Sequence, residues 1–450
     1  MLSTRWYKFE IFGENYSKII RNTGVKSMKT QRDVIVIGAG MAGLLTAYFL
    51  QKEGRDVLVL EANEVASGQT GRTTAKITSQ HGLKYAKLIK QVGKKRARLY
   101  AQANEMAISE YERLVQELDV DCDFKRTNSF LYTTSQEWLL YKEYQATQLL
   151  GIDSFLTTDT ELPFFISGAL GFRNQAQFLP QPFLMRIAQE LEILEHTKVK
   201  KVCRHLVMTE DGFFTAQHIV IATHYPLINA PGFYFARQHQ ERSYVLKLSN
   251  CRPFKNMYYS IDKYGLSLRQ AGDYLLLGGG AHRTGKTKPM DSYDFLNHAR
   301  EMYFPQSKIV YKWSAQDCMP HDGIPFIGKY SLIHPNWYVA TGFQKWGMTT
   351  SMIAARIISD AICGRAPIYA KAFSPQRFLL RASFKDAVLD SLISVKSLVC
   401  GAFSRKTPRC PHLGCKLVWN PNEQTWDCPC HGSRFEESGD LLDNPAKRDL

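Results

Sequence analysis

The clearest apolar pattern lies near the front of the chain, where a strand, a helix and a second strand follow one another. Residues 33–37 read Asp-Val-Ile-Val-Ile, a continuous apolar run that is typical of a buried parallel strand. Apolar residues at helical spacing over 44–50 predict a helix that ends near Gly54, and residues 57–60 predict the next strand. The pattern therefore predicts a parallel α/β sheet in this part of the chain.

Two further stretches have helical spacing. Residues 84–118 place apolar side chains every three or four positions and also hold a run of basic residues between Lys84 and Arg98. Such a run usually marks the solvated face of a helix. The second stretch has an apolar stripe at Phe384, Val388, Leu392, Val395 and Val399. This stripe predicts a helix that either docks between domains or lies in a core.

Length and composition limit the class of protein. The chain has 450 residues, whereas one hydrophobic core usually serves about 250–300, so we expect two or three domains. No stretch reaches the about 20 apolar residues of a transmembrane helix, and the region after Met1 lacks the pattern of a secretory signal. We therefore predict a cytoplasmic protein. The net charge of +15 leaves room for an acidic protein partner or peripheral membrane contact, but we expect no nucleic acid partner.

The turn after the first predicted strand has the spacing of a dinucleotide-binding loop. Gly38-Ala39-Gly40-Met41-Ala42-Gly43 joins strand and helix, and Glu61 ends the second strand. Gly38 allows a tight turn, Gly40 lets the backbone approach a pyrophosphate, and Gly43 permits close packing of helix on strand. The start of the helix faces the phosphates, and Glu61 accepts hydrogen bonds from ribose hydroxyls. A second loop of this kind is not evident, which argues against a nicotinamide cofactor as the electron source.

Four residues near the C-terminus form a metal-binding pattern. Cys410 and His412 make a Cys-x-His pair, and Cys428 and His431 make a Cys-x-x-His pair. Two thiolates suit one iron, and two neutral imidazoles suit the other iron, of a mixed-ligand [2Fe–2S] cluster. Two cysteines and two histidines can also form a tetrahedral zinc site. Zinc would not need the His-Gly-Ser continuation of the second pair, so we favour the cluster.

Both loops resemble those of a Rieske iron–sulfur domain. They read Cys410-Pro411-His412-Leu413-Gly414-Cys415 and Cys428-Pro429-Cys430-His431-Gly432-Ser433. The resemblance implies a disulfide between Cys415 and Cys430, and a cluster whose histidine edge is exposed to the next electron acceptor. The strands that normally precede the first loop are missing, so we expect this shortened module to lean on the rest of the chain.

Four other segments resemble the D-amino-acid-oxidase-like FAD-dependent oxidoreductases, in the subgroup that has a C-terminal Rieske domain. They are residues 68–76, 219–224, 322–328 and 337–349. The resemblance implies FAD as the cofactor. It places the following residues at the flavin, in addition to the glycine loop and Glu61: Arg72, Thr73, Thr74, Gly342, Trp346, Gly347, Met348 and Thr349. Lys345 lies in the same turn, and a lone lysine there is expected to be solvated.

These signals predict a fold class and a domain order. We expect an α/β protein with a Rossmann-like FAD-binding domain, an inserted α+β substrate domain and a small C-terminal Rieske-type cluster-binding module. The predicted parts are an N-terminal extension (1–30), the FAD-dependent oxidoreductase domain (31–370), a linker or docking helix (371–403) and the Rieske [2Fe–2S] module (404–450). The substrate subdomain is expected at residues 80–165 and 235–320.

The leading functional hypothesis follows from this resemblance. It is an FAD-dependent oxidoreductase that oxidises a small organic substrate, such as an amine or amino acid, and passes single electrons through the cluster to an external protein or quinone. The alternative is a flavo-iron–sulfur protein that only relays electrons between partner proteins. An aromatic-ring oxygenase would need an iron held by two histidines and a carboxylate, and the sequence has no paired-histidine motif beside an acid. Lys76, His224 and His282 are candidates for a catalytic role because they lie near the flavin motifs.

Overall fold

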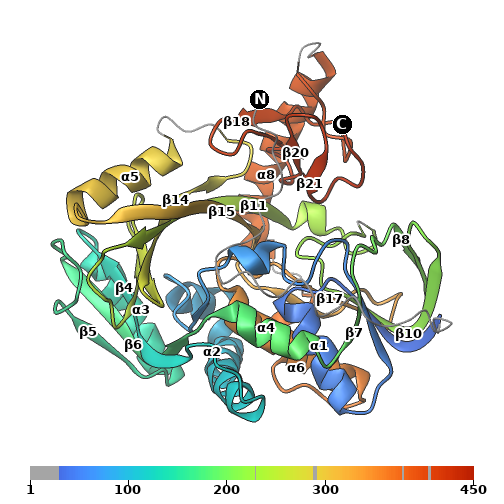
Figure 1. Cartoon of the computed structure of the whole chain (residues 1–450), viewed down its shortest axis with the longest axis horizontal. Coiled ribbons are helices and arrows are strands. Elements are labelled where there is room, and N and C mark those ends of the chain that lie inside the picture. The colour runs from blue at the N-terminus through green and yellow to red at the C-terminus, as the bar shows by residue number, and fades with distance from the viewer. Residues whose placement is uncertain (1–29, 229, 287–290, 378–379, 404–406) are drawn as a thin grey trace.

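The computed structural model describes residues 30–228, 230–286, 291–377, 380–403 and 407–450 (Figure 1). The predicted N-terminal extension lies outside these residues, apart from Thr30. The described chain forms two large sheets and one small C-terminal sheet. The predicted α/β fold with a small C-terminal module is confirmed.

The first sheet contains the predicted strand–helix–strand unit. Its central strand order is β16–β17–β10–β1–β2–β7. The bounds are β1 Gln31–Ile37, β2 Val57–Leu60, β7 Glu192–Leu194, β8 Lys201–Cys203, β9 Leu206–Met208, β10 Phe213–Ile221, β16 Phe326–Lys329 and β17 Trp337–Thr341. Strands β7, β2, β1, β10 and β17 run parallel. Their carboxyl ends therefore meet at one edge, which is where ligands bind in folds of this kind.

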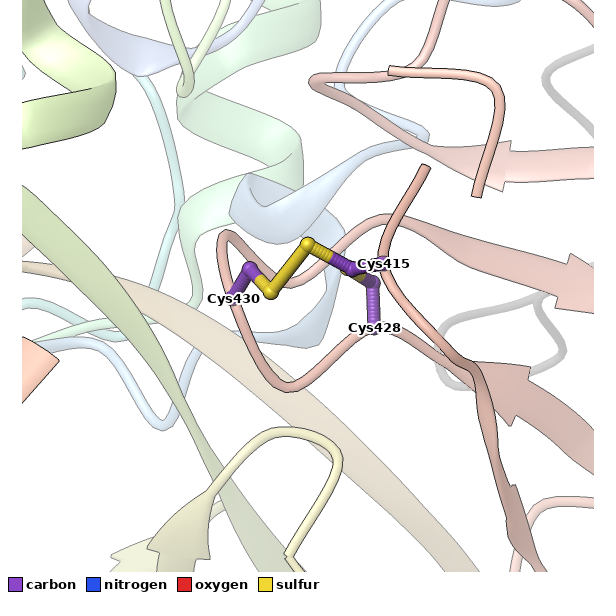
Figure 2. A group of neighbouring side chains, drawn as sticks. All are labelled: Cys415, Cys428 and Cys430. Atoms are coloured by element: carbon purple, nitrogen blue, oxygen red, sulfur yellow. A yellow bond between two sulfur atoms is a disulfide. The ribbon is translucent and has the colours of Figure 1, made fainter. Parts of the chain in front are cut away.

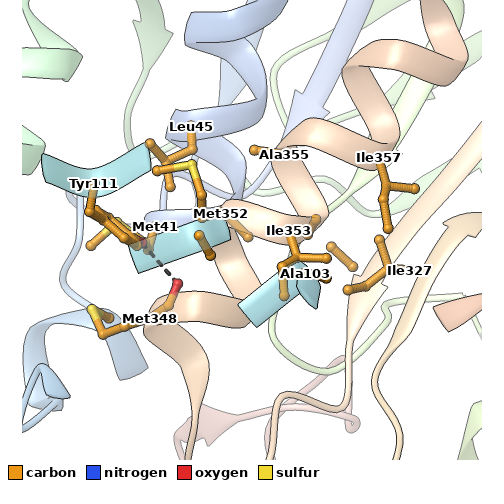
Figure 3. Packing of buried hydrophobic residues seen from close by; sticks show 14 of the residues in the cluster. Met41, Leu45, Ala103, Tyr111, Ile327, Met348, Met352, Ile353, Ala355 and Ile357 are labelled. Atoms are coloured by element: carbon orange, nitrogen blue, oxygen red, sulfur yellow. Dashed lines mark hydrogen bonds between the residues drawn. The ribbon is translucent and has the colours of Figure 1, made fainter. Parts of the chain in front are cut away.

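Three helices pack together in the largest core, beside the first sheet. They are α1 (Met41–Lys52), α2 (Tyr85–Glu117) and α6 (Gly347–Ile362). Figure 3 shows Met41 and Met352 meeting Tyr111 of α2 in this core. The Tyr111 hydroxyl donates a 2.9 Å hydrogen bond to the carbonyl oxygen of Met348. This bond and the apolar contacts hold the first turns of α1 and α6 in place.

Helix α2 is the helix predicted at residues 84–118. Most of its lysines, including Lys87, Lys90 and Lys94, are exposed, so the prediction of a solvated basic face is confirmed for these residues. Lys84 is the exception, because it is buried at the start of the helix. Its Nζ donates to the carbonyl oxygen of Gly323 and to Oε1 of Gln344. The Lys84 side chain thus ties α2 to the loop that follows β17.

The second sheet forms the inserted domain. Its strand order is β15–β11–β14–β13–β12–β4–β6–β3, with β5 paired to β6. The bounds are β3 Lys76–Ile77, β4 Lys125–Thr133, β5 Ser154–Thr157, β6 Gly168–Gln177, β11 Gln238–Ser249, β12 Met257–Ser260, β13 Ser267–Ala271, β14 Tyr274–Arg283 and β15 Lys308–Pro320, and helices α3 (Glu137–Leu150) and α5 (Ser292–Tyr303) contact it. The first segment contributing to this sheet runs on to Gln177, beyond the range 80–165 expected for it.

The C-terminal module is a small antiparallel sheet. Its strands are β18 Val418–Asn420, β19 Thr425–Asp427, β20 Arg434–Glu436 and β21 Leu441–Asp443. Helix α8 (Leu380–Phe403) runs beside this sheet (Figure 1). The N–H of Lys416 donates to the carbonyl oxygen of Ser397, and Ser397 Oγ donates to the carbonyl oxygen of Lys416. The helix therefore contacts the module through Ser397.

The face by which α8 docks is the opposite of the predicted one. Val388, Leu392, Val395 and Val399 of the apolar stripe are exposed, and Phe384 lies outside the residues whose surroundings the structure describes. The prediction that this stripe packs against a neighbouring domain or core is therefore wrong for these four residues. Polar contacts of the other face decide the orientation of the helix, and a hydrophobic pattern cannot reveal them.

Candidate cofactor sites

The glycine loop between β1 and α1 has the close backbone packing that a dinucleotide site requires. A Cβ atom on Gly43 would clash with the carbonyl oxygen of Gly38, so only glycine lets the helix approach the strand this closely. The N–H of Ala39 donates a 2.7 Å hydrogen bond to Oε2 of Glu61. Gly40 has no side chain to cap helix α1, and although the N–H of Met41 donates to Thr70 Oγ1 over 3.1 Å, the positive end of the helix dipole suits a phosphate.

A cavity of about 360 Å³ opens from this loop. The predicted FAD residues that line it are Gly38, Gly40, Met41, Ala42, Glu61, Thr73, Gly342, Gly347 and Met348. Thr73 follows the short helical turn Gln69–Arg72, and the others come from the carboxyl ends of β1, β2 and β17 and from the starts of α1 and α6. The glycine cradle, the helix start and the cavity together fit a bound dinucleotide such as FAD.

The other predicted FAD residues lie behind the cavity wall, where they hold its loops. Gly43 packs on β1. The Arg72 carbonyl accepts from Trp313 Nε1, the Thr74 carbonyl accepts from Arg269, Trp346 stacks on His81, and Thr349 Oγ1 donates to the Thr78 carbonyl. Their direct contact with the cofactor stays a prediction.

Sequence reasoning missed a charged group on the cavity wall. Asp317 of β15 and Lys345 both line the cavity, and Lys345 Nζ lies 3.4 Å from Oε2 of Glu241. Burial alone would lower the pKa of Lys345, but the neighbouring Tyr259, Glu241 and Asp317 raise it. The expectation of a solvated lysine is therefore wrong. Burial raises the pKa of Asp317 to about 7, and the charge of Glu241 adds to the rise.

Of the three candidates for a catalytic role, only His224 lines the cavity. Its Nε2 is buried and makes no hydrogen bond within the described part of the chain, and burial lowers its pKa to about 4. Lys76 donates to Ser267 Oγ over 2.7 Å, and burial lowers its pKa to about 7. His282 lies further away, where its Nε2 meets the Tyr244 hydroxyl at 3.1 Å. The structure does not bring these three together.

The two C-terminal loops bring the four predicted cluster ligands together. The rings of His412 and His431 lie 4.9 Å apart, centroid to centroid. The thiols of Cys410 and Cys428 share a hydrogen bond, which lowers the pKa of Cys410, and the backbone N–H of His412 lowers it further. Thiolate is the form that binds iron.

The histidines are also in the form that binds iron. Burial lowers the pKa of His431 to about 3 and that of His412 to about 4. Both imidazoles are thus neutral, as metal ligation requires. The Nδ1 atom of His431 is buried and accepts or donates no hydrogen bond among the described residues. A buried nitrogen of this kind, beside two thiols, fits a Rieske-type [2Fe–2S] cluster.

Cys415 and Cys430 form the disulfide that the resemblance implies (Figure 2). It joins the first cluster loop to the second, and the Sγ atoms of both residues lie within 4.8 Å of that of Cys428. A disulfide uses up both thiols, so Cys415 and Cys430 are not available as metal ligands. Their role is to hold the loops together around the cluster position.

The Rieske module forms part of the wall of the flavin cavity. Residues 441–445 line the cavity together with the glycine loop. Gln240 of β11 also lines it, and its Nε2 donates to the carbonyl oxygens of His431 and Asn444, over 2.7 and 3.1 Å. Phe235 lies edge-on to the ring of His431, 5.9 Å away. The expected leaning of the module on the flavin domain is confirmed.

This contact corrects the expectation of an exposed histidine edge. His431 is only 5% exposed, because Gln240 and Phe235 of the flavin domain cover it. His412 is half-buried, and Leu413 beside it is exposed. His431 therefore faces the flavin domain, and Phe235 also lies edge-on to the ring of His412, 6.4 Å away.

The structure also assembles two histidines and a carboxylate that are far apart in sequence. Asp390 Oδ2 of α8 lies 3.1 Å from His239 Nδ1 and 2.6 Å from His321 Nε2. Arg283 pairs with Oδ1 of the same carboxylate. Such a triad is the ligand set of a mononuclear iron site, but an iron here would lie beside the guanidinium of Arg283. A hydrogen-bonded ion network accounts for this cluster better.

The fold and the two sites together define an FAD-dependent oxidoreductase with a Rieske iron–sulfur module. The family model described as "FAD dependent oxidoreductase" matches residues 33–361, and that of the Rieske [2Fe-2S] domain matches residues 400–450. The chain belongs to the FAD-dependent oxidoreductase family, and its cofactors are FAD and a Rieske-type [2Fe–2S] cluster.

Individual relatives agree with this assignment. The chain is 35% identical to YhfW of Bacillus subtilis, which is named as a Rieske 2Fe-2S iron-sulfur protein, over 94% of this chain and 93% of that one. It is 23% identical to the gamma-glutamylputrescine oxidoreductase of Escherichia coli, over 74% of this chain and 84% of that one. The structure resembles glycine oxidase from Geobacillus kaustophilus, with a TM-score of 0.66 and 18% identity, over 78% of this chain and all of that one.

Another structural relative is L-proline dehydrogenase from P. horikoshii, with a TM-score of 0.65 and 18% identity, over 78% of this chain and 98% of that one. At such low identity, both solved structures show the shared fold alone. Within the described residues, no helix is both long and apolar enough to cross a membrane.

Proposed function

We propose that the protein oxidises a small amine or amino acid at its flavin and sends the electrons through its own Rieske cluster to an external acceptor. Bound FAD supplies two-electron oxidation of the substrate, and a [2Fe–2S] cluster takes up one electron at a time. The remaining residues of the chain have to hold the two cofactors close together and keep water out between them.

The observation that carries the proposal is that the flavin domain and the Rieske module line the same cavity. Residues 441–445 of the Rieske module line the flavin cavity. Gln240 lines the same cavity and donates to the carbonyl oxygen of His431, a predicted cluster ligand. Gln316 extends this contact, since its Nε2 donates to the Gly432 carbonyl and to Gln240 Oε1, each over 2.8 Å. Electron transfer from the flavin to the cluster within one chain requires that the two sites lie next to each other in this way.

The class of substrate is supported by relatives and by the charge of the cavity wall. The gamma-glutamylputrescine oxidoreductase, glycine oxidase and L-proline dehydrogenase named above act, by their names, on amines or amino acids. Asp317 and Lys345 give the wall one carboxyl group and one ammonium group. These groups suit a substrate that has an amine and a carboxylate of its own.

An anaerobic reduction experiment tests the proposal. The purified protein is mixed with glycine, proline or gamma-glutamylputrescine without oxygen, while absorbance follows the flavin and electron paramagnetic resonance follows the cluster. We expect one of these compounds to bleach the flavin and then to produce the signal of the reduced cluster. In a Cys428→Ser variant the flavin should still bleach without any cluster signal. Flavin reduction that leaves the wild-type cluster oxidised would refute the internal relay, and reduction only by a protein donor would favour the electron-transfer alternative.

A further inference from the structure

Helix α8 has its polar face turned inward and its apolar face turned outward. Asp390, Ser397 and Gly401 lie on the inner face, where Asp390 meets His239 and His321, and Gly401 packs against the backbone of Gly414–Lys416. The opposite face holds the α8 stripe, which we define as Val388, Leu392, Val395 and Val399. These residues are 42%, 63%, 58% and 53% exposed, respectively. This arrangement is the reverse of that in an ordinary surface helix.

The α8 stripe is continuous along the helix. Its members follow one another at intervals of four, three and four residues, so that they share one side of the helix. Leu389 and Leu398 flank it and are also exposed, at 49% and 37%. A contiguous apolar surface on a protein in water marks an interaction site. Ion pairs and hydrogen bonds of the inner face fix the helix in an orientation that leaves this apolar surface exposed.

The charges around the stripe favour a negative partner. Lys396 is the one charged residue that α8 exposes between Val388 and Gly401. Arg409 and Lys416, before and after the first cluster loop, lie on the other side, because Lys416 is hydrogen-bonded to Ser397 on the inner face and pairs with Arg409. The described residues from Val388 to Asn420 include a single acid, Asp390, and its carboxylate is turned inward onto Arg283 and the two histidines.

We propose that the α8 stripe docks this protein on an anionic lipid surface. Leucine and valine side chains enter the boundary between headgroups and acyl chains, while Lys396 meets the lipid phosphates. The stripe spans eleven residue steps, or about 17 Å of helix, which suits a helix lying in the plane of the surface.

Vesicle sedimentation of the full-length holoprotein tests this inference. Vesicles of phosphatidylcholine alone are compared with vesicles that also contain phosphatidylglycerol. We expect binding to the mixed vesicles and much weaker binding to the neutral ones. The double variant Leu392→Glu/Val395→Glu should lower the partition coefficient by about tenfold or more, because two buried aliphatic groups are lost. Lys396→Glu should lower it by about fivefold or more on the anionic vesicles only.

A matched control uses apolar residues that are even more exposed but lie elsewhere. Leu332 and Ile333, in the loop before β17, are 84% and 72% exposed. The variant Leu332→Glu/Ile333→Glu should bind vesicles as the wild type does, and circular dichroism should show that both double variants are folded. Failure of the wild type to bind mixed vesicles, or equal binding by the α8 variant, would overturn the inference. A dimer that the α8 variant dissociates, without vesicle binding, would instead assign the stripe to a second copy of the chain.

This experiment does not depend on turnover. Vesicle binding is measured without substrate, so it can succeed or fail independently of the proposed amine oxidation and of the electron relay. Docking that is lost in the α8 variant while anaerobic flavin reduction is unchanged would separate the two functions.

Discussion

Asp390 of α8 forms an ion pair with Arg283 of β14, and this pair lies directly behind the second cluster loop. Arg283 donates its Nε to the carbonyl oxygen of Pro429 and its Nη2 to that of Cys430, each over 3.1 Å. Arg283 thus connects helix α8, the second sheet and the loop that carries His431. The position of the Rieske module depends on this connection.

Replacing Asp390 by Asn should loosen the module. The change leaves Arg283 and the two histidines without their buried counter-charge, which typically costs about 3 kcal/mol or more. Urea unfolding followed by cluster absorbance should show the loss. Asp360→Asn is the matched control, since Asp360 pairs with the half-exposed Arg365 and surface pairs contribute at most about 1 kcal/mol. Equal stability of the two variants would contradict the role of the pair.

Gly43→Ala should abolish tight flavin binding. The new methyl group would clash with the Gly38 carbonyl, so that α1 must move away from the glycine loop and the phosphate site is lost. We expect at least about a tenfold weaker affinity for FAD, the rough effect of losing one good polar contact. Gly212→Ala, whose Cβ would meet nothing within 4 Å, is the control and should retain its flavin. Affinity is read from the quenching of flavin fluorescence.

The charge of Asp317 should make the bound flavin sensitive to pH near neutrality. Its pKa is about 7, raised first by burial, whereas an unfolded aspartate titrates near about 3.9. The folded state therefore favours the protonated acid. The associated stability is complete below about pH 4 and is lost as the pH rises through 7.

The measurement is a pH titration of the flavin absorbance. A spectral change with a midpoint near pH 7 is expected in the wild type and should disappear in Asp317→Asn. Asp273→Asn, in the exposed turn between β13 and β14, should behave as the wild type does. Persistence of the change in Asp317→Asn would assign it to another group.

Removal of the disulfide should shorten the life of the cluster. The Cys415–Cys430 bond spans a separation of fifteen residues, and closing a loop of that length typically contributes about 3 kcal/mol. The double variant Cys415→Ser/Cys430→Ser should bleach faster than the wild type when its visible absorbance is followed in air. Cys203→Ser, at an exposed free cysteine, should bleach at the wild-type rate. Equal rates for all three proteins would show that the bond is dispensable.

Local motifs were sufficient to predict much of this molecule. The glycine loop and the two cluster loops are each encoded within a few residues, so their spacing reveals them, whereas the Cys415–Cys430 pair followed from the resemblance to Rieske loops. The fold class followed from the strand–helix–strand pattern and from the family resemblance. Gly43 is an example of such a local signal, because its role depends only on the carbonyl group of Gly38 in the same turn.

Features that depend on distant segments were missed. Lys345 looked solvated because nothing near it in sequence indicates Glu241 or Asp317. His239, His321 and Asp390 meet from two strand ends and a helix, so their grouping leaves no spacing signal. The α8 stripe was predicted to be packed but is exposed, for the same reason. The contacts of Asp390 with residues far away in the sequence fix which face of the helix turns inward.

The position of β21 has a consequence for how the protein is made. Gln69 beside the glycine loop donates a 3.4 Å hydrogen bond to Asp443, and residues 441–445 line the cavity, so the end of the chain forms part of the wall that would enclose a nucleotide. We therefore expect FAD to be inserted before this end of the chain docks. Cells starved of riboflavin should then accumulate this polypeptide with its iron–sulfur segment undocked and open to proteolysis.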